Sequence, residues 1–123
     1  MITVLCFGNE FLPEDSLAKK LAEEIKLKGV RFVKSDNVDE LLDYEGKLVI
    51  LDVVKDLKKV SYFGIEDIEV DKIFTSHDLG LDFFLKIMKL IGKTKDITII
   101  GIPQKGDEEQ CKYEVIKLLK RLV

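Results

Sequence analysis

The sequence predicts an α/β fold: a single-domain three-layer sandwich, in which a mostly parallel twisted sheet of about five strands has helices on both faces. Short runs rich in Val, Ile and Leu alternate with segments whose apolar residues recur every three or four positions. The short runs are apolar at almost every position, as is typical of parallel strands that are covered on both faces. Alternation of such strands with helices predicts a parallel sheet between helical layers.

Length and composition predict one compact domain spanning residues 1–123. The chain has 123 residues, of which 46% are hydrophobic and 35% charged. This balance is typical of a packed core under a charged surface, and the length suits a single domain. No internal repeat or low-complexity segment interrupts the sequence.

The charge balance argues against a nucleic-acid partner. Lys and Arg number 20 against 23 Asp and Glu, so the formal net charge is −3 and there is no basic excess to neutralise phosphates. No apolar stretch approaches the roughly 20 residues that span a bilayer. The first residues lack the basic start of a secretion signal, so we expect a cytoplasmic protein without a membrane partner.

In the first half of the chain, strands are expected at residues 2–7, 30–34 and 47–54. A helix is expected to begin near Pro13 and to stop at Gly29. Its first turn holds Glu14 and Asp15, which complement the helix dipole. The apolar stripe of this helix is Leu17, Ala18, Leu21, Ala22 and Ile25, and Lys19, Lys20, Glu23 and Glu24 are expected to face water. Asn37 and Glu40 have the spacing of a capping box that opens a short helix.

In the second half, strands are expected at residues 72–75 and 96–102, with an edge strand near 60–63 inside a loop. A helix with Leu81, Phe84, Leu85, Met88 and Ile91 on one face is expected to end at Gly92. Asp107 is expected to cap the last helix. The inner stripe of that helix is Cys111, Val115, Leu118, Leu119 and Leu122.

Polar residues follow three of the expected strands and suggest a site. Asp15 lies a few residues after the first strand, Asp52 ends the third, and His77 follows the fourth. Since parallel strands end at the same edge of a sheet, these three side chains should converge there. Two oxygen ligands and one nitrogen ligand would leave coordination positions open, as in metal sites that bind a substrate or water.

Each of these residues also has a simpler interpretation. Asp15 could serve only the helix dipole, Asp52 could cap a turn, and His77 could be incidental in its loop. Asp78 could orient the imidazole or cap the following helix. A receiver-like arrangement, in which Glu10, Glu14 and Asp15 bind Mg²⁺, is a further possibility.

Other motif classes are not supported. Gly8-Asn9 lacks the remaining glycines of a dinucleotide fingerprint, and there is no phosphate loop or Cys-x-x-Cys pair. Ser16 and Ser61 have no nucleophile-elbow context. Cys6 and Cys111 lie in apolar contexts and are expected to be buried core thiols.

Four segments together resemble the hydrogenase maturation peptidases. The first is "GNEFLPEDS" after the opening strand, where that family has Gly-Asn followed by a pair of acids. The others are "LVILDVV", which resembles a strand ending in the family's Asp, "TSHDLGLDFFLKIM", which resembles its loop histidine and Leu-rich helix, and "ITIIGIP", which resembles its final strand. In order and spacing these pieces cover most of the chain.

The resemblance implies an endopeptidase that removes the C-terminal extension of a nickel-containing hydrogenase large-subunit precursor. Nickel already placed in the precursor would be the recognition signal, so that no further cofactor is implied. Asp15, Asp52 and His77 would be the catalytic and metal-contacting residues. Gly8, Asn9, Glu14 and Asp78 would contact the substrate. The resemblance implies no Ser or Cys nucleophile, and it implies a peptidase of the aspartic type.

The sequence departs from the family pattern in two places. Glu14-Asp15 stands where two aspartates are common, and Val53-Val54-Lys55-Asp56 stands where a glycine-rich loop usually follows the strand-end Asp. The chain is also short for the family. The alternative hypothesis is therefore a non-enzymatic α/β binding or scaffold module, either receiver-like or a degenerate paralogue.

Overall fold

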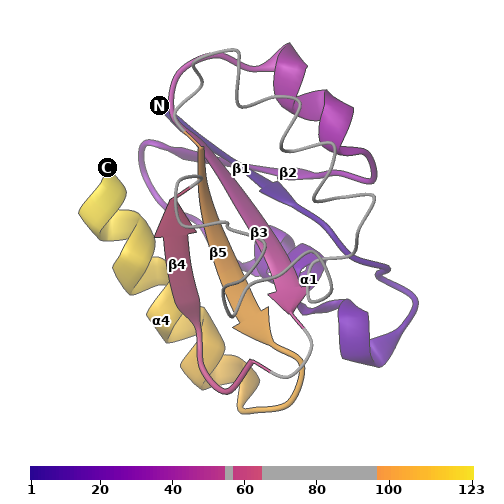
Figure 1. Cartoon of the computed structure of the whole chain (residues 1–123). Coiled ribbons are helices and arrows are strands. Elements are labelled where there is room, and N and C mark those ends of the chain that lie inside the picture. Colours follow the sequence, from indigo (N-terminus) through magenta and orange to yellow (C-terminus); the bar gives the residue numbers. More distant parts are fainter. Residues whose placement is uncertain (55–56, 65–96) are drawn as a thin grey trace.

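A computed structural model of the chain describes residues 1–54, 57–64 and 97–123. Within these residues five strands form one sheet in the order β2-β1-β3-β5-β4 (Figure 1). The strands are β1 (Ile2–Cys6), β2 (Val30–Lys34), β3 (Leu48–Val54), β4 (Ser61–Gly64) and β5 (Ile97–Pro103). All neighbouring pairs are parallel except β4 with β5. The predicted mostly parallel sheet and its edge strand near residues 60–63 are therefore confirmed.

The pairing register places the ends of β1 and β3 at the same level. Cys6 lies opposite Leu51, and the N–H of Phe7 donates to the carbonyl of Leu51 at 2.9 Å. Asp52 therefore lies level with the end of β1, where the chain leaves the sheet. This register brings Asp52 to the edge of the sheet from which the loop to Asp15 leaves.

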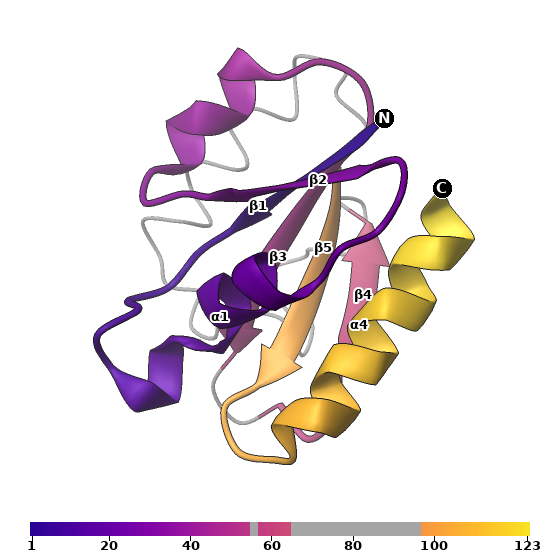
Figure 2. The same cartoon turned by 180° about the vertical axis from the view of Figure 1, so that it is seen from behind.

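Two α-helices of the described part pack on the same face of the sheet. They are α1 (Leu17–Glu24) and α4 (Glu108–Leu122), which both lie behind the sheet in Figure 1 and in front of it in Figure 2. Their apolar stripes meet alternate residues of β1, β3 and β5 in one core, as the period-two geometry of strands requires. The core contains Val4, Cys6, Ala18, Leu21, Val49, Leu51, Ile100, Ile102, Cys111, Val115 and Leu119.

Residues on the opposite face of the sheet are buried as well. Leu5, Leu48, Ile50 and Ile99 have no exposed surface. The helix expected over residues 81–91 and the strand expected at 72–75 lie outside the described residues. The prediction of helices on both faces is thus met for one face in the described part.

The first helix differs from the prediction at both ends. Residues Pro13–Asp15 form a separate 3₁₀ turn, η1, and α1 begins only at Leu17. The Asp15 N–H donates to the Leu12 carbonyl, three residues back, and this closes the tighter turn. Glu14 and Asp15 are therefore not in the first turn of the α-helix. The helix stops at Glu24, and the positive φ of Gly29, 83°, belongs to the turn that leads into β2.

The predicted caps have different outcomes. Asp107 caps α4 as expected, because its carboxylate accepts the N–H of Glu109 at 2.9 Å. The segment after Asn37 is a 3₁₀ helix, η2 (Val38–Asp43), and the Glu40 carboxylate accepts from the Ser35 hydroxyl. The serine at the end of β2 thus binds the acid that the sequence assigned to a capping box.

Lys19 was expected to face water, and this prediction is wrong. Only 4% of the residue is exposed, and its ammonium pairs with the carboxylate of Asp36, just after β2. Lys19 lies between the apolar positions Ala18 and Leu21 of α1, so its side chain runs along the sheet before it reaches the exposed acid. A buried positive charge therefore lies close to the carboxyl ends of β1 and β2.

Candidate functional site

The loop after β1 folds back on itself at Gly8 and Asp15. Gly8 has a φ of 113°, which side chains other than glycine rarely adopt. A Cβ at this position would lie 2.3 Å from the carbonyl oxygen of Asp15 and 3.2 Å from its Oδ1. Gly8 therefore allows the backbone and side chain of Asp15 to approach the end of β1. Its predicted role in substrate contact is not tested by this packing.

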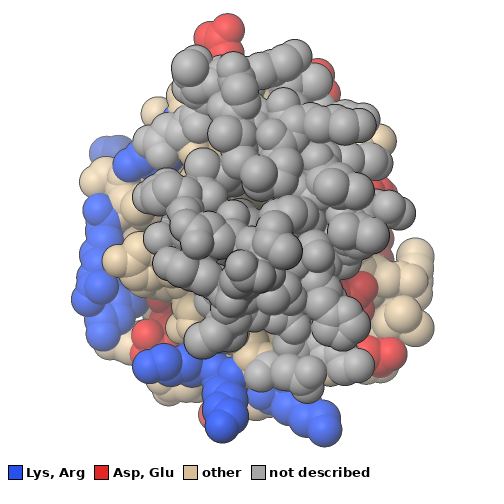
Figure 3. Space-filling model, viewed as in Figure 1, with Lys and Arg blue, Asp and Glu red and all other residues tan. Residues whose placement is uncertain are grey.

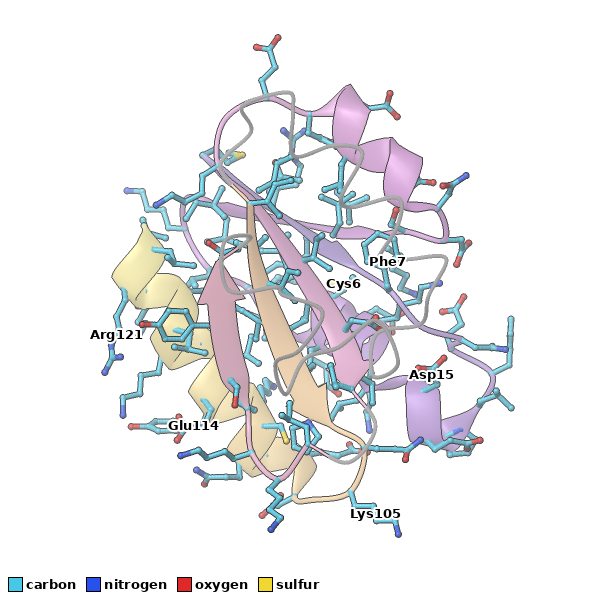
Figure 4. All side chains as sticks on the ribbon, viewed as in Figure 1. Cys6, Phe7, Asp15, Lys105, Glu114 and Arg121 are labelled. Atoms are coloured by element: carbon cyan, nitrogen blue, oxygen red, sulfur yellow. The ribbon has the colours of Figure 1, made fainter. Side chains whose placement is uncertain are left out.

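Asn9 organises the same loop through its backbone and its side chain. Its N–H donates to Asp15 Oδ2 at 2.8 Å, and its Oδ1 accepts the N–H of Phe11 at 2.9 Å. Its carbonyl accepts the N–H of Leu12 at 3.2 Å. These contacts hold the Asp15 carboxylate at the edge of the sheet. Figure 4 shows Asp15 on the 3₁₀ turn, near the end of β3.

Asp52 is a partly buried acid with a strongly perturbed pKa. Burial raises the pKa of Asp52 to about 7, and the nearby carboxylate of Asp15 adds to this rise. The N–H of Val53 donates to Asp52 Oδ1 at 2.9 Å and opposes the shift. Because the charge of Asp15 contributes to the pKa of Asp52, the two acids lie in one electrostatic environment. The structure therefore brings together two of the three residues that were predicted to converge.

The cysteines are free and buried, as predicted. Burial raises the pKa of the Cys6 thiol to about 12, with a further increase from the carboxylate of Asp52 and a decrease from Lys19. Burial also raises the pKa of Cys111. Thiols with such pKa values are protonated at neutral pH and are poor nucleophiles. Cys6 is thus a buried core residue within electrostatic range of Asp52.

The remaining predicted site residues are Glu14, His77 and Asp78. Glu14 is exposed on η1, one residue before Asp15. His77 and Asp78 lie outside the described residues, so the third member of the site stays a prediction. In residues 1–54, 57–64 and 97–123, no group of three His, Cys, Asp or Glu side chains is placed to hold a metal ion.

Sequence reasoning missed two features beside the acids. Lys19 lies within electrostatic reach of Cys6. Phe11 and Leu12, in the loop between Asn9 and η1, are exposed by 87% and 45%. The run Glu10-Phe11-Leu12 held a signal for the second feature, since two apolar residues follow a strand end without belonging to the helical stripe. Nothing in the sequence distinguished Lys19 from the exposed Lys20.

In the described part of the chain, no helix is both long enough and apolar enough to cross a membrane.

Comparisons with known proteins bear on the fold. No protein-family model matches the sequence, and no curated protein matches it. Solved structures do match along almost the whole chain. A NiFe hydrogenase maturation protease, HybD from Thermococcus kodakarensis, has 22% identity and a TM-score of 0.72, with 98% of this chain and 97% of that chain covered.

Two further structures give the same result. The hydrogenase maturating endopeptidase HybD from E. coli has 19% identity and a TM-score of 0.64, with 98% of this chain and 92% of that chain covered. The hydrogenase 2 maturation peptidase from Thaumarchaeota archaeon SCGC_AB-539-E09 has 24% identity and a TM-score of 0.64, with 98% and 96% covered.

The sheet order and the two acids at its carboxyl edge define a small α/β domain with a candidate functional site. Over nearly its whole length, the chain has the fold of the hydrogenase maturation proteases.

The Gly8 packing gives a prediction about stability. Gly8→Ala should lower the free energy of unfolding by about 2–4 kcal/mol, because it adds a backbone clash to an unfavourable φ. Gly46→Ala is the matched control, since Gly46 also has a positive φ, 83°, but its added Cβ would lie 3.9 Å from the nearest atom, the carbonyl oxygen of Met1. The control should lose only about 1 kcal/mol. Equal losses in urea denaturation would contradict the close contact with Asp15.

The raised pKa of Asp52 gives a prediction about pH dependence. The native carboxyl keeps its proton up to about pH 7, whereas the unfolded carboxyl loses it near 3.8. The native state therefore binds more protons between these values, and the Asp52 contribution to the free energy of unfolding falls as pH rises. Asn cannot ionise, so the stability of Asp52→Asn relative to wild type should increase by about 2–4 kcal/mol from pH 4 to pH 8.

Denaturation of both proteins at pH 4, 6 and 8 measures this difference. Asp43→Asn makes the same chemical change at an exposed position and reports its effect over the same range. A stability difference between wild type and Asp52→Asn that does not vary with pH would show that folding does not raise the pKa of Asp52.

Proposed function

We propose that the chain is an endopeptidase that removes the C-terminal extension of a nickel-containing hydrogenase large-subunit precursor. The observation that carries the proposal is the pair of acids at the carboxyl edge of the sheet. Asp15 and Asp52 come from different elements, share one electrostatic environment and lie in the fold of hydrogenase maturation proteases. The predicted third residue, His77, belongs to the proposal on the basis of the sequence.

The chemistry of the two acids suits hydrolysis of a peptide bond. A carboxyl with a pKa of about 7 can take a proton from water or give one to a leaving amine at neutral pH. The carboxylate of Asp15 already accepts the N–H of Asn9, so its position is fixed before the substrate binds. This pair would make the enzyme an aspartic-type peptidase, with no Ser or Cys nucleophile.

Nickel enters this proposal as part of the substrate. The precursor would bring the ion, and Asp15, Asp52 and His77 would contact it as two oxygen ligands and one nitrogen ligand. A cation at this position would favour the ionised form of Asp52 over the protonated one. The bound ion could polarise the scissile carbonyl or activate a water molecule. Gly8, Asn9, Glu14 and Asp78 would lie around the substrate, in a cytoplasmic enzyme.

The alternative, a non-enzymatic binding or scaffold module, is not favoured by any feature of the described residues. A scaffold would not need a buried acid whose pKa is raised by a second acid. Such perturbed groups concentrate at functional sites.

The test is incubation with candidate large-subunit precursors that carry or lack nickel, followed by intact mass measurement. We expect loss of the C-terminal extension only from the nickel-loaded precursor. Asp15→Asn, Asp52→Asn and His77→Gln should each lower kcat/KM at least about a hundredfold, because each removes a metal contact or proton-transfer group. Thermal denaturation of each variant shows whether the fold survives.

Asp43→Asn is the matched control, since Asp43 is exposed in η2, away from the carboxyl edge, and should leave processing unchanged. Normal processing by all three site variants would refute their roles. Failure of the wild-type protein to shorten any nickel-loaded precursor would refute the proposed function itself.

A further inference from the structure

The loop before η1 carries an exposed apolar tip, formed by Phe11 and Leu12. Phe11 is 87% exposed, more than any other large hydrophobic residue in the part of the chain that the structure describes. Tyr62 and Tyr113 are also exposed, but each carries a hydroxyl group that water can solvate. Phe11 has no polar atom. A single exposed apolar residue is common on protein surfaces. This tip differs in its position close to Asp15 in the chain and in the hydrogen bonds that fix its loop.

The tip is held in place by the same contacts that position Asp15. Asn9 Oδ1 accepts the N–H of Phe11, and the Asn9 carbonyl accepts the N–H of Leu12. The Leu12 carbonyl then accepts the N–H of Asp15 at 2.9 Å. Asp15 completes the arrangement by accepting the N–H of Asn9. The apolar tip and the candidate catalytic acid are thus parts of one hydrogen-bonded loop.

These hydrogen bonds matter for binding, because a loop that is already fixed loses little conformational entropy when it binds a partner. An exposed aromatic ring on such a loop has the features of a binding anchor. The ring also lies only four residues from Asp15 in a loop that closes on itself. A protein bound at the acids would therefore meet Phe11 as well.

The loop that carries the tip is acidic. The segment from Gly8 to Ser16 contains Glu10, Glu14 and Asp15 and no basic residue. Glu10 pairs with the Lys34 ammonium at 3.2 Å, which leaves the other two acids to set the charge of the loop. On the face shown in Figure 3, acidic side chains lie along the right-hand edge, whereas Lys and Arg gather at the left and below. Charge complementarity selects a partner surface with basic residues.

We propose that Phe11, supported by Leu12, inserts into an apolar depression on the folded body of the precursor protein, and that basic side chains border this depression. The contact anchors the precursor while its C-terminal extension reaches the acids. This inference rests on the proposed function and adds a second contact surface to it. Phe11 is a binding residue here and does not touch the reacting atoms.

The experiment measures KM and kcat for processing of the nickel-loaded precursor by wild type, Phe11→Ala, Phe11→Leu and Tyr113→Ala. We expect Phe11→Ala to raise KM about tenfold, because it removes most of the apolar surface that the tip would bury against the precursor. It should change kcat less than twofold. Phe11→Leu keeps an apolar side chain and should restore most of the affinity. Tyr113→Ala removes another exposed ring, from α4, and should leave both constants unchanged.

Salt gives a second measurement. If basic residues surround the depression, the KM of wild type should rise between 50 and 500 mM salt, roughly severalfold. The melting temperature of Phe11→Ala should equal that of wild type, since the ring is exposed.

The outcomes separate the two proposals. Cleavage by wild type with equal KM for Phe11→Ala and wild type would overturn the anchor while the peptidase function stands. A drop in kcat alone would also overturn it, because the ring would then act on the chemistry. If wild type neither binds nor cleaves the precursor, both the function and this contact are refuted.

Discussion

The hydrogen bond from the N–H of Asn9 to the carboxylate of Asp15 is the contact on which the candidate site depends. It closes a loop of seven residues that begins where β1 ends, and it holds an acid at the carboxyl edge of the sheet. Gly8 makes the closure possible, because any larger residue would collide with the Asp15 backbone. The parallel pairing of β1 with β3 then places Asp52 at the same edge. Local turn geometry and sheet register together produce the acid pair.

The proximity of these acids has an energetic cost and a chemical consequence. Burial and the charge of Asp15 both disfavour ionised Asp52, and one N–H from Val53 compensates only in part. A structure that maximised stability alone would avoid this arrangement, since buried acids stabilise a fold only when their charge is well compensated. A strained electrostatic arrangement at a strand end is instead typical of a site whose charge is balanced by a substrate or a cation.

Much of the fold followed from hydrophobic patterning. The mainly apolar runs at residues 2–6, 48–51 and 97–102 are typical of strands covered on both faces, and the helices predicted between them indicated a common strand direction. Asp52 was identifiable because it interrupts such a run. The convergence of Asp15 with Asp52 was predictable for the same topological reason, and in the structure the two acids lie within electrostatic range of each other.

Other details depended on contacts that hydrophobic patterning does not specify. The sequence placed Pro13, Glu14 and Asp15 in the first turn of an α-helix, but these residues form a separate 3₁₀ turn from which Asp15 accepts the N–H of Asn9. The sequence does not distinguish Lys19 from a solvent-facing lysine, because its partner Asp36 comes from the segment that follows β2. Equally, the exposure of Phe11 follows from the closed loop and not from its hydrophobicity. The environment of Lys19 is set by a distant segment, whereas Asp15 and Phe11 are placed by the closed loop that contains them.

The central claim is that Asp15 and Asp52 share one site, and NMR titration of the Asp52 side-chain carboxyl carbon tests it most directly. In wild type, we expect Asp52 to titrate near pH 7. In Asp15→Asn, the pKa of Asp52 should fall part of the way towards 3.8, since burial remains but the neighbouring charge is gone. Titration of Asp52 near pH 4 in both proteins would contradict the shared site.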